Sequence, residues 1–227
     1  MSEQATYKSN GKLLITGEYV VLDGATALAI PTKYGQSLTV KDTNEMTLHW
    51  ISKDHSGNSW FETHINLSTL SSSNNSKIAQ TLCTILQTAR AHNPSFLKQS
   101  KGVTVQSQLD FPRDWGLGTS STLINNIAQW AQIDAFALLK ESFGGSGYDI
   151  SAGQHNSPIL YSLKDKNPKV KTCKLNWNFT DHLFFVHLNQ KQDSKEGIET
   201  YRGKQIQPGL IETISDLSRK TILCYNL

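Results

Sequence analysis

The residues from Gly116 to Ser121 combine two glycines with a run of hydroxyl side chains, in the order Gly116-Leu117-Gly118-Thr119-Ser120-Ser121. The glycines let an anion approach the main chain without an obstructing Cβ atom. The hydroxyl residues can cap a following helix and leave several backbone N–H groups free. Free N–H groups at a helix N-terminus, aligned with the helix dipole, attract an anion. The segment therefore predicts a phosphate-binding turn.

A strand and a helix flank this turn and would hold it in place. Upstream, apolar and polar residues alternate from Val103 to Phe111, which is the period of a half-buried strand. Downstream, Leu123, Ile127 and Ala131 recur every fourth residue and mark one apolar helix face. The sequence contains no Walker A pattern, and a glycine turn between a strand and a helix also occurs without any ligand. A purely structural turn therefore stays open as an alternative.

Two further segments place charged side chains beside glycines. The first runs from Asn10 to Gly24 and contains Lys12 and Glu18, and the second is Gly147-Tyr148-Asp149. Taken singly, the lysine could be a solvated strand residue, the glutamate a turn residue and the aspartate a helix N-cap. A chemical role for these side chains rests on the three segments taken together.

Together, the three segments resemble the GHMP small-molecule kinases, the superfamily of galactokinase, homoserine kinase, mevalonate kinase and phosphomevalonate kinase. Residues 10–24 resemble the family's N-terminal P-G-K-[LV]-[LI]-L-x-G-E-[HY]-x-V-[LV]-x-G pattern. Residues 112–122 resemble its P-x-x-x-G-L-G-S-S-A phosphate loop, with Thr119 at the first hydroxyl position. Residues 147–151 resemble a bacterial subgroup with a Gly-Tyr-Asp-Ile-Ala signature, with Ser151 in place of the alanine. The resemblance extends from about residue 6 to at least residue 203.

The resemblance implies a fold and a reaction. The fold would be a ribosomal protein S5 domain 2-like N-terminal domain over residues 1–175, followed by a partial ferredoxin-like C-terminal domain over residues 176–227. The reaction would transfer the γ-phosphoryl group of ATP, with Mg²⁺, to a hydroxyl or phosphate of a small-molecule acceptor. Mevalonate or a phosphomevalonate-like metabolite is the expected acceptor class.

The resemblance also implies roles for individual residues. Asp149 would accept or orient the proton of the acceptor hydroxyl, and Lys12 would favour the ionised aspartate and stabilise the transferring phosphoryl group. Glu18 and Tyr19 match positions that face the acceptor, and Ser120 would coordinate Mg²⁺. The main chain of the loop would bind the triphosphate through Gly116, Leu117, Gly118, Thr119, Ser120 and Ser121. Phosphoryl transfer depends mainly on such positioning and charge neutralisation.

Three features depart from the family pattern. Glu141 lies eight residues before Asp149, close to where mevalonate kinases place a Mg²⁺-binding glutamate but out of clear register. Tyr19 stands where mevalonate kinases commonly have histidine, which favours a phosphomevalonate-like or other acceptor. The family's third, C-terminal glycine-rich motif is absent, since Gly209 is the last glycine of the sequence. A shortened, non-catalytic protein that binds a nucleotide or a partner is therefore the alternative.

Composition excludes several other classes. The formal net charge of +3 is spread over scattered lysines without a nucleic-acid-binding motif, so no nucleic-acid partner is expected. Three widely spaced cysteines and a polar N-terminus predict a reduced, cytoplasmic protein that does not span a membrane.

The chain ends in an apolar segment without a glycine cap, which indicates a shortened C-terminus. An unburied helix face at 210–223 would favour self-association as a homodimer.

The remaining periodicities favour an α+β class, because strands and helices do not alternate regularly. Strands are expected near 5–9, 12–22, 27–31, 35–42, 46–52, 58–66, 159–163 and 181–188. Helices are expected near 78–93, 134–142, 193–203 and 208–226. The basic stretch 164–174 is interpreted as a solvated loop at a domain boundary.

Overall fold

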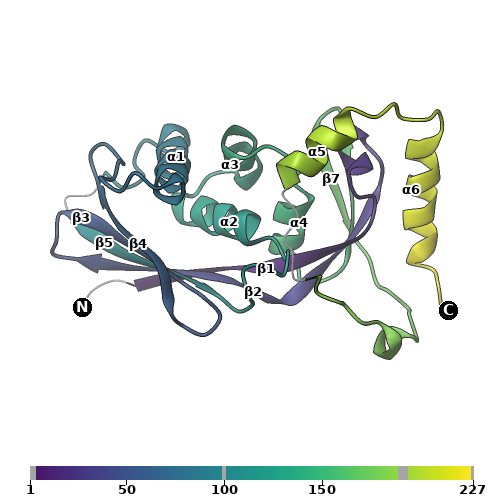
Figure 1. Ribbon diagram of the computed structural model, residues 1–227, viewed down its shortest axis with the longest axis horizontal. Coiled ribbons are helices and arrows are strands. Elements are labelled where there is room, and N and C mark those ends of the chain that lie inside the picture. The colour runs from purple at the N-terminus through teal and green to yellow at the C-terminus, as the bar shows by residue number, and fades with distance from the viewer. Residues whose placement is uncertain (1–3, 99–100, 189–193, 226–227) are drawn as a thin grey trace. The chain divides into compact units, whose positions relative to one another are not determined.

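The computed structural model describes residues 4–98, 101–188 and 194–225 (Figure 1). The chain packs as two compact units, and two long strands contribute to both of them. Unit 1 comprises Met1–Asn10, Tyr34–Arg113 and Gly118–Gly145. Unit 2 comprises Gly11–Lys33, Asp114–Leu117 and Ser146–Leu227.

Unit 1 is a layer of strands covered on one side by helices (Figure 1). Its strands are β3 (Thr47–Lys53), β4 (Ser59–Asn66), β5 (Gly102–Leu109), the first part of β1 (Gln4–Thr16) and the later part of β2 (Ala27–Thr43). They follow the order β4-β3-β5-β2, in which only the β3–β5 pair is parallel, and β1 pairs with β2. The helices are α1 (Lys77–His92), α2 (Thr119–Ala131) and α3 (Ala135–Ser142).

The apolar faces of these elements form the core of unit 1. Alternate residues of β3 and the apolar face of α2 are fully buried, including Trp50, Ile124 and Ile127. Ser76 caps α1, because its side chain accepts a hydrogen bond from the backbone N–H of Ala79 at 3.3 Å. The buried layers give the phosphate-loop helix α2 a fixed support.

Unit 2 contains an antiparallel set of strands in the order β2-β6-β7. The strands β6 (Ile159–Lys164) and β7 (Asn167–Thr172) form a hairpin. The described residues of the unit also form the α-helices α4 (Tyr148–Gln154), α5 (Ser194–Arg202) and α6 (Leu210–Thr221) and the short 3-10 helices η1 (Val20–Asp23) and η2 (Thr180–His182). Leu28, Ile150 and Tyr161 are fully buried in its core.

The mainly antiparallel pairing agrees with the predicted α+β class. Most of the expected strands and helices are present, and the boundaries of α1 and α3 lie close to the predicted ones. The S5-like and ferredoxin-like descriptions and the boundary at 175/176 stay predictions, since the packing units divide the chain on a different basis.

Two predictions about the N-terminal strands were wrong. The strand expected over 12–22 ends at Thr16, because the chain turns at Gly17 and forms η1 from Val20. The strands expected over 27–31 and 35–42 are one continuous strand, since Pro31 to Gln36 stays extended and pairs onward with β5. Apolar periodicity identified strand residues here, but it did not show where the backbone turns.

Two predictions about the second half of the chain were also wrong. The basic stretch interpreted as a loop contains β7, which follows a tight turn with positive φ at Asp165 and Lys166. Positive φ at both central residues is the geometry of a two-residue hairpin, and a lysine-rich strand suits a sheet edge. The strand expected over 181–188 is absent from the described residues, where η2 is followed by irregular chain with exposed Phe184 and Val186.

Helix α6 buries an unexpected face. Ser218 donates a hydrogen bond to the carbonyl of Thr26 at 2.6 Å, and Ser215 accepts one from the Thr26 N–H at 2.9 Å. Leu217 and Leu223 are exposed instead, at 51% and 76%. The homodimer expected from this apolar face stays a prediction.

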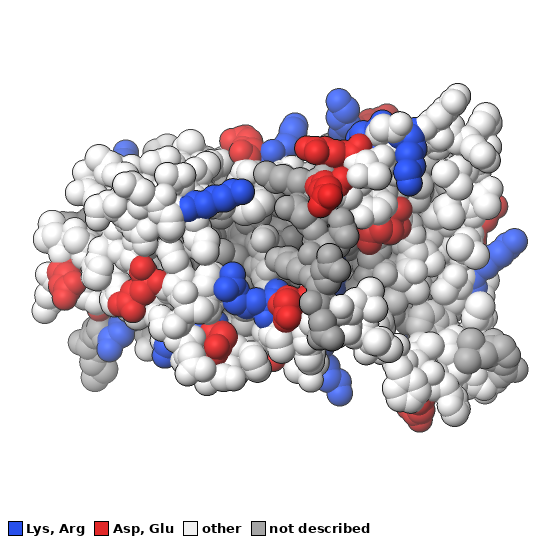
Figure 2. Space-filling view, viewed as in Figure 1, with Lys and Arg blue, Asp and Glu red and all other residues white. Residues whose placement is uncertain are grey.

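The surface has mixed charge. On the face shown in Figure 2, Lys and Arg side chains are interspersed with Asp and Glu. Within the described part of the chain, none of the helices has the length and apolar character needed to cross a membrane.

Candidate active site

A lysine and an aspartate from two different elements of unit 2 form an ion pair. Lys12 lies on β1, and Asp149 lies in the first turn of α4. The Lys12 Nζ and the Asp149 Oδ2 are 4.0 Å apart, with side chains 16% and 26% exposed. Gly147 is the N-cap of α4 and no side chain caps this helix, so Asp149 does not serve as the N-cap. Its carboxylate faces the lysine and remains accessible to a ligand.

Two buried tyrosines surround this pair. The Lys12 Nζ lies over the ring of Tyr148, 5.3 Å from its centroid, within cation–π range. Burial, together with the Asp149 charge, raises the pKa of Tyr148 far above that of a free tyrosine. The same two effects raise the pKa of Tyr161, whose hydroxyl donates a hydrogen bond to the Ser146 carbonyl. Both phenols therefore stay neutral, and the second one fixes the turn that precedes α4.

Glu18 lies close enough to the ion pair to interact with both of its charges. Burial raises the pKa of the Glu18 carboxyl, the Lys12 charge opposes this rise and the Asp149 charge adds to it. Two carboxylates and one ammonium thus interact electrostatically within unit 2.

Tyr19 has a strained backbone. Its φ and ψ are 61° and −46°, and the Val20 N–H donates to the Glu18 carbonyl at 2.8 Å. This i→i+2 hydrogen bond defines a γ-turn of the rare positive-φ form. A non-glycine residue in this conformation costs about 1–3 kcal/mol, and such strain concentrates at functional sites. The turn directs the Tyr19 side chain toward α5, where Tyr201 stacks on it with ring centroids 5.8 Å apart.

The phosphate loop has the backbone expected of an anion-binding turn. Gly116 and Gly118 have φ of 75° and 90°, values that favour glycine. Gly118 is the N-cap of α2, and no side chain caps the helix, so the prediction of a Thr/Ser cap was wrong. The uncapped first turn instead leaves the N–H groups of residues 119–121 without intrahelical partners.

Two hydrogen bonds fix the loop on either side of its centre. In unit 2, the Lys12 N–H donates to the Leu117 carbonyl at 3.0 Å, which ties the first part of the loop to β1. In unit 1, the Thr122 hydroxyl donates to Gln36 Oε1 at 2.7 Å, which anchors the start of α2. The first bond anchors the backbone at Leu117, and the second anchors α2 directly after the loop.

The two expected metal-binding residues differ in their surroundings. Ser120 is exposed at the start of α2, so its hydroxyl is accessible. Glu141 pairs with His92 of α1, with 3.2 Å between its Oε1 and the histidine Nε2. Among the described residues, no group of three or more His, Cys, Asp or Glu side chains forms a metal-binding cluster.

The structure thus brings one subset of the predicted site residues together. Lys12, Glu18, Tyr19 and Asp149 belong to unit 2, with Gly116 and Leu117 of the loop. Gly118, Thr119, Ser120, Ser121 and Glu141 belong to unit 1. The roles assigned to these residues stay predictions.

Sequence reasoning missed three residues of this region. Tyr148 stands beside Asp149 in the matched segment, but nothing in the sequence indicated that its ring underlies Lys12. Tyr161 is a fully buried aromatic residue of β6, and its hydrogen bond to Ser146 spans fifteen residues. Gly197 on α5 leaves room for the Tyr19 hydroxyl, a contact that no local sequence pattern predicts.

Comparison with solved structures identifies the fold. The mevalonate kinase of Methanococcus jannaschii matches 99% of this chain and 74% of its own, at a TM-score of 0.70 and 14% identity. The L. major mevalonate kinase in complex with R-mevalonate matches 98% of this chain and 69% of its own, at a TM-score of 0.67 and 14% identity. The Streptococcus pneumoniae phosphomevalonate kinase in complex with phosphomevalonate and AMPPNP matches 96% of this chain and 76% of its own, at a TM-score of 0.62 and 13% identity.

These structural neighbours are GHMP kinases, and the chain has their fold over nearly its whole length. No protein-family model matches the sequence, and no curated protein matches it. The predicted resemblance is thereby confirmed at the level of the fold.

Proposed function

We propose that the protein is an ATP-dependent small-molecule kinase that phosphorylates a hydroxyl or phosphate group of a mevalonate- or phosphomevalonate-like acceptor. The observation that carries this proposal is the 4.0 Å pair of Lys12 and Asp149, in a chain with the fold of the GHMP kinases. A base and a cation held together suit a reaction in which a hydroxyl loses a proton while negative charge moves onto a phosphoryl group.

Each residue of the candidate site in unit 2 has its own role in this reaction. The Asp149 carboxylate accepts the proton of the acceptor hydroxyl, or orients that hydroxyl for attack. The Lys12 ammonium lies beside the carboxylate and lowers the energy of the developing phosphoryl charge. Tyr148 holds the ammonium over its ring, and Tyr161 holds the turn from which α4 begins. Glu18 and Tyr19 contact the acceptor.

The phosphate loop fits a nucleotide. Its two positive-φ glycines and the uncapped first turn of α2 present main-chain N–H groups, which suit the oxygens of a triphosphate. The exposed Ser120 hydroxyl suits Mg²⁺, which binds through few protein ligands together with phosphate oxygens and water. When bound, ATP supplies the phosphoryl group and Mg²⁺ neutralises part of its charge. Glu141 is less suited to be a second metal ligand, because its carboxylate pairs with His92.

The test is a coupled ADP-release assay with Mg·ATP against mevalonate, phosphomevalonate, homoserine and galactose. Acceptor-dependent ADP release by this chain supports the proposal and identifies the acceptor. Nucleotide binding without release on any of the four acceptors contradicts it and favours a non-catalytic nucleotide-binding protein.

A further inference from the structure

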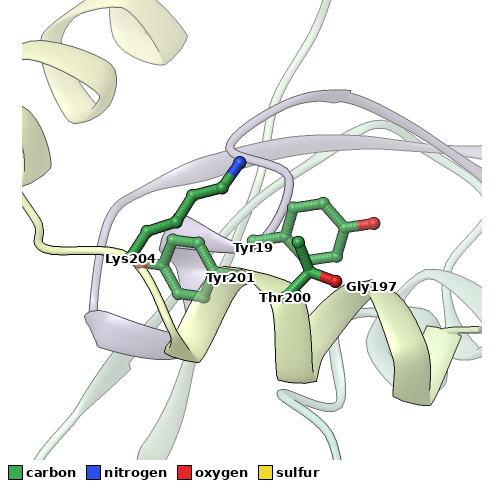
Figure 3. Close-up of a pocket in the computed structure, with 5 residues that line it drawn as sticks. All are labelled: Tyr19, Gly197, Thr200, Tyr201 and Lys204. Atoms are coloured by element: carbon green, nitrogen blue, oxygen red, sulfur yellow. The ribbon is translucent and has the colours of Figure 1, made fainter.

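A small pocket lies between the Tyr19 turn and helix α5, wholly within unit 2 (Figure 3). Its volume is about 230 Å³, and it is lined by Tyr19, Gly197, Thr200, Tyr201 and Lys204. The last four recur at the spacing of one helix face, continued past the end of α5. Figure 3 shows Thr200, Tyr201 and Lys204 projecting to the side on which Tyr19 lies. One strained turn and one helix face thus define a compact cavity.

The Tyr19 wall of the pocket is held rigidly. The γ-turn sets the direction of the side chain, and the stacked Tyr201 ring packs against it. Gly197 is buried, and a Cβ atom there would overlap the Tyr19 hydroxyl and lie 3.0 Å from the ring carbon Cζ. Only glycine therefore lets the Tyr19 ring lie against α5 without displacement. A ring fixed in this way is suited to recognising a ligand, because little conformational freedom is lost on binding.

Of the two basic side chains at the pocket, Arg202 pairs within the protein and Lys204 can pair with a ligand. The Asp23 carboxylate accepts hydrogen bonds from the Tyr201 hydroxyl and, at 2.6 Å, from the Arg202 guanidinium. Arg202 is therefore neutralised within the protein. In the parts of the chain that the structure describes, no carboxylate forms an ion pair with Lys204. The ammonium of Lys204 and the hydroxyls of Thr200 and Tyr19 give the lining a positive charge and several hydrogen-bond donors.

The pocket borders the proposed catalytic pair along the chain. Glu18 directly precedes Tyr19, and the charges of Lys12 and Asp149 both shift the Glu18 pKa.

We propose that the Lys204 pocket binds the anionic group, a carboxylate or a phosphate, of the small molecule that is phosphorylated. This proposal rests on the proposed function and adds to it the site that selects the acceptor. Lysine is a flexible point charge that pairs well with either anion, and the neighbouring hydroxyls can donate to its oxygens. A neutral sugar would leave the ammonium without a counter-charge and would bind poorly.

Calorimetric titration without nucleotide tests the pocket independently of turnover. The probes are mevalonate, which carries a carboxylate, phosphomevalonate, which carries a carboxylate and a phosphate, and galactose, which is neutral. We expect Lys204→Met to weaken binding of the anionic probes at least tenfold and Lys204→Arg to restore most of it. The matched control is Lys169→Met, which removes an exposed lysine of β7 outside the pocket and should change nothing.

Kinetics give a second readout in which the acceptor KM and kcat separate. Lys204→Met should raise the acceptor KM while leaving kcat and the KM for ATP near their original values, because the lysine holds the acceptor and does not act on the phosphoryl group. A Lys204 effect on both anionic probes assigns the pocket to the carboxylate, and an effect on phosphomevalonate alone assigns it to the phosphate.

Three outcomes would contradict the proposal that the pocket binds an anionic group. They are anion binding that is unchanged in Lys204→Met, galactose binding as tight as that of mevalonate, and no measurable binding of any probe at millimolar concentration. Failure of the proposed function looks different. Lys204-dependent anion binding without ADP release would support the anion pocket and contradict the proposed kinase activity.

Discussion

The ammonium of Lys12 lies over the face of the Tyr148 ring, 5.3 Å from its centroid, and 4.0 Å from the Asp149 carboxylate. Tyr148 is buried, and burial raises its pKa so far that its hydroxyl stays neutral. The ring therefore offers Lys12 a π-face without adding a competing negative charge. Residues 148 and 149 are neighbours at the start of one helix, so a single turn of α4 sets both contacts of the lysine.

This arrangement predicts different effects for two substitutions at Tyr148. Tyr148→Phe keeps the ring and should leave kcat close to the original value. Tyr148→Leu removes a cation–π contact of about 0.5–2 kcal/mol, which corresponds to a loss of about 2- to 30-fold in kcat. The KM for ATP should not change. Steady-state kinetics check this, and equal kcat values for the two variants would show that the ring does not position Lys12.

Asp149→Asn should lower kcat by about 10²- to 10⁴-fold, because the amide cannot accept the proton of the acceptor hydroxyl. Nucleotide affinity should be retained, since the substitution leaves the phosphate loop unchanged. The matched control is Asp165→Asn, on the exposed turn between β6 and β7, which should not affect either quantity. ADP-release kinetics and nucleotide titration measure the two effects. A near-normal kcat in Asp149→Asn would remove Asp149 as the base.

The sequence predicted the local features of this site better than its long-range contacts. The positions of α2 and of the phosphate loop followed from periodicity and from two glycines, because these are properties of neighbouring residues. Lys12 and Asp149 were matched to separate motifs, but their 4.0 Å contact joins residues more than a hundred positions apart. No spacing rule gives such a distance.

The errors in the fold have a similar cause. The segment 181–188 contains a strand-like apolar run from Leu183 to Val186, yet a strand needs a partner, and the described residues supply none. β7 contains Pro168 and lysines, a poor strand composition that pairing with β6 outweighs. The γ-turn at Tyr19 depends on a backbone conformation that tyrosine rarely adopts, so residue preferences indicated a continued strand there.

Ser120→Ala should weaken the affinity for Mg·ATP by about 2- to 10-fold, the effect of losing one net polar interaction of about 0.5–1.5 kcal/mol. The main-chain N–H groups of the loop remain, so nucleotide binding itself should persist. Titration with ATP in the presence of a chelator is the control, since a hydroxyl that acts through the metal has no effect when the metal is absent. Equal affinities of the two proteins for Mg·ATP would refute the assignment of Ser120.

Gly197→Ala should displace the Tyr19 ring, because the new Cβ atom would overlap its hydroxyl. Overpacking of this kind costs about 1–3 kcal/mol, and for a chain of this length each kcal/mol lowers Tm by about 2–4 °C. Thermal unfolding measures the loss, and the acceptor KM should rise with it. Combining the change with Tyr19→Phe should recover part of the lost stability, since the hydroxyl makes the closest contact.

Gly203→Ala is the matched control for that substitution. A Cβ atom at Gly203 would lie 3.6 Å from its nearest neighbour, which is an ordinary contact. Its Tm should stay close to that of the unmodified protein. A Gly197→Ala variant as stable and as active as Gly203→Ala would show that Tyr19 does not need its place on α5.

The contact between Asp23 and α5 predicts a dependence of stability on pH. Burial would raise the pKa of Asp23, but the hydrogen bonds from Tyr201 and Arg202 outweigh it and lower that pKa. Because the pKa of Asp23 is lower in the folded state, the ionised carboxylate stabilises the fold fully at pH values above its unfolded-state pKa of about 3.9. This contribution is lost as the pH falls through the lower folded-state pKa. On the alkaline side, burial and the Asp23 hydrogen bond raise the pKa of Tyr201 to about 12. The phenol's contribution is then complete below about pH 10 and is lost as the pH approaches 12.

Asp23→Asn should therefore lower the free energy of unfolding at pH 7 by about 1 kcal/mol, as expected for a partly exposed ion pair, and flatten its decrease between pH 5 and pH 3. Urea unfolding across this pH range measures both effects, and hydrogen exchange should locate the loosened amides in α5. Asp216→Asn is the control, because Asp216 also pairs with an arginine but is 61% exposed on α6. If both variants kept the acid slope of the unmodified protein, the Asp23 carboxylate would not be what fastens α5 beside Tyr19.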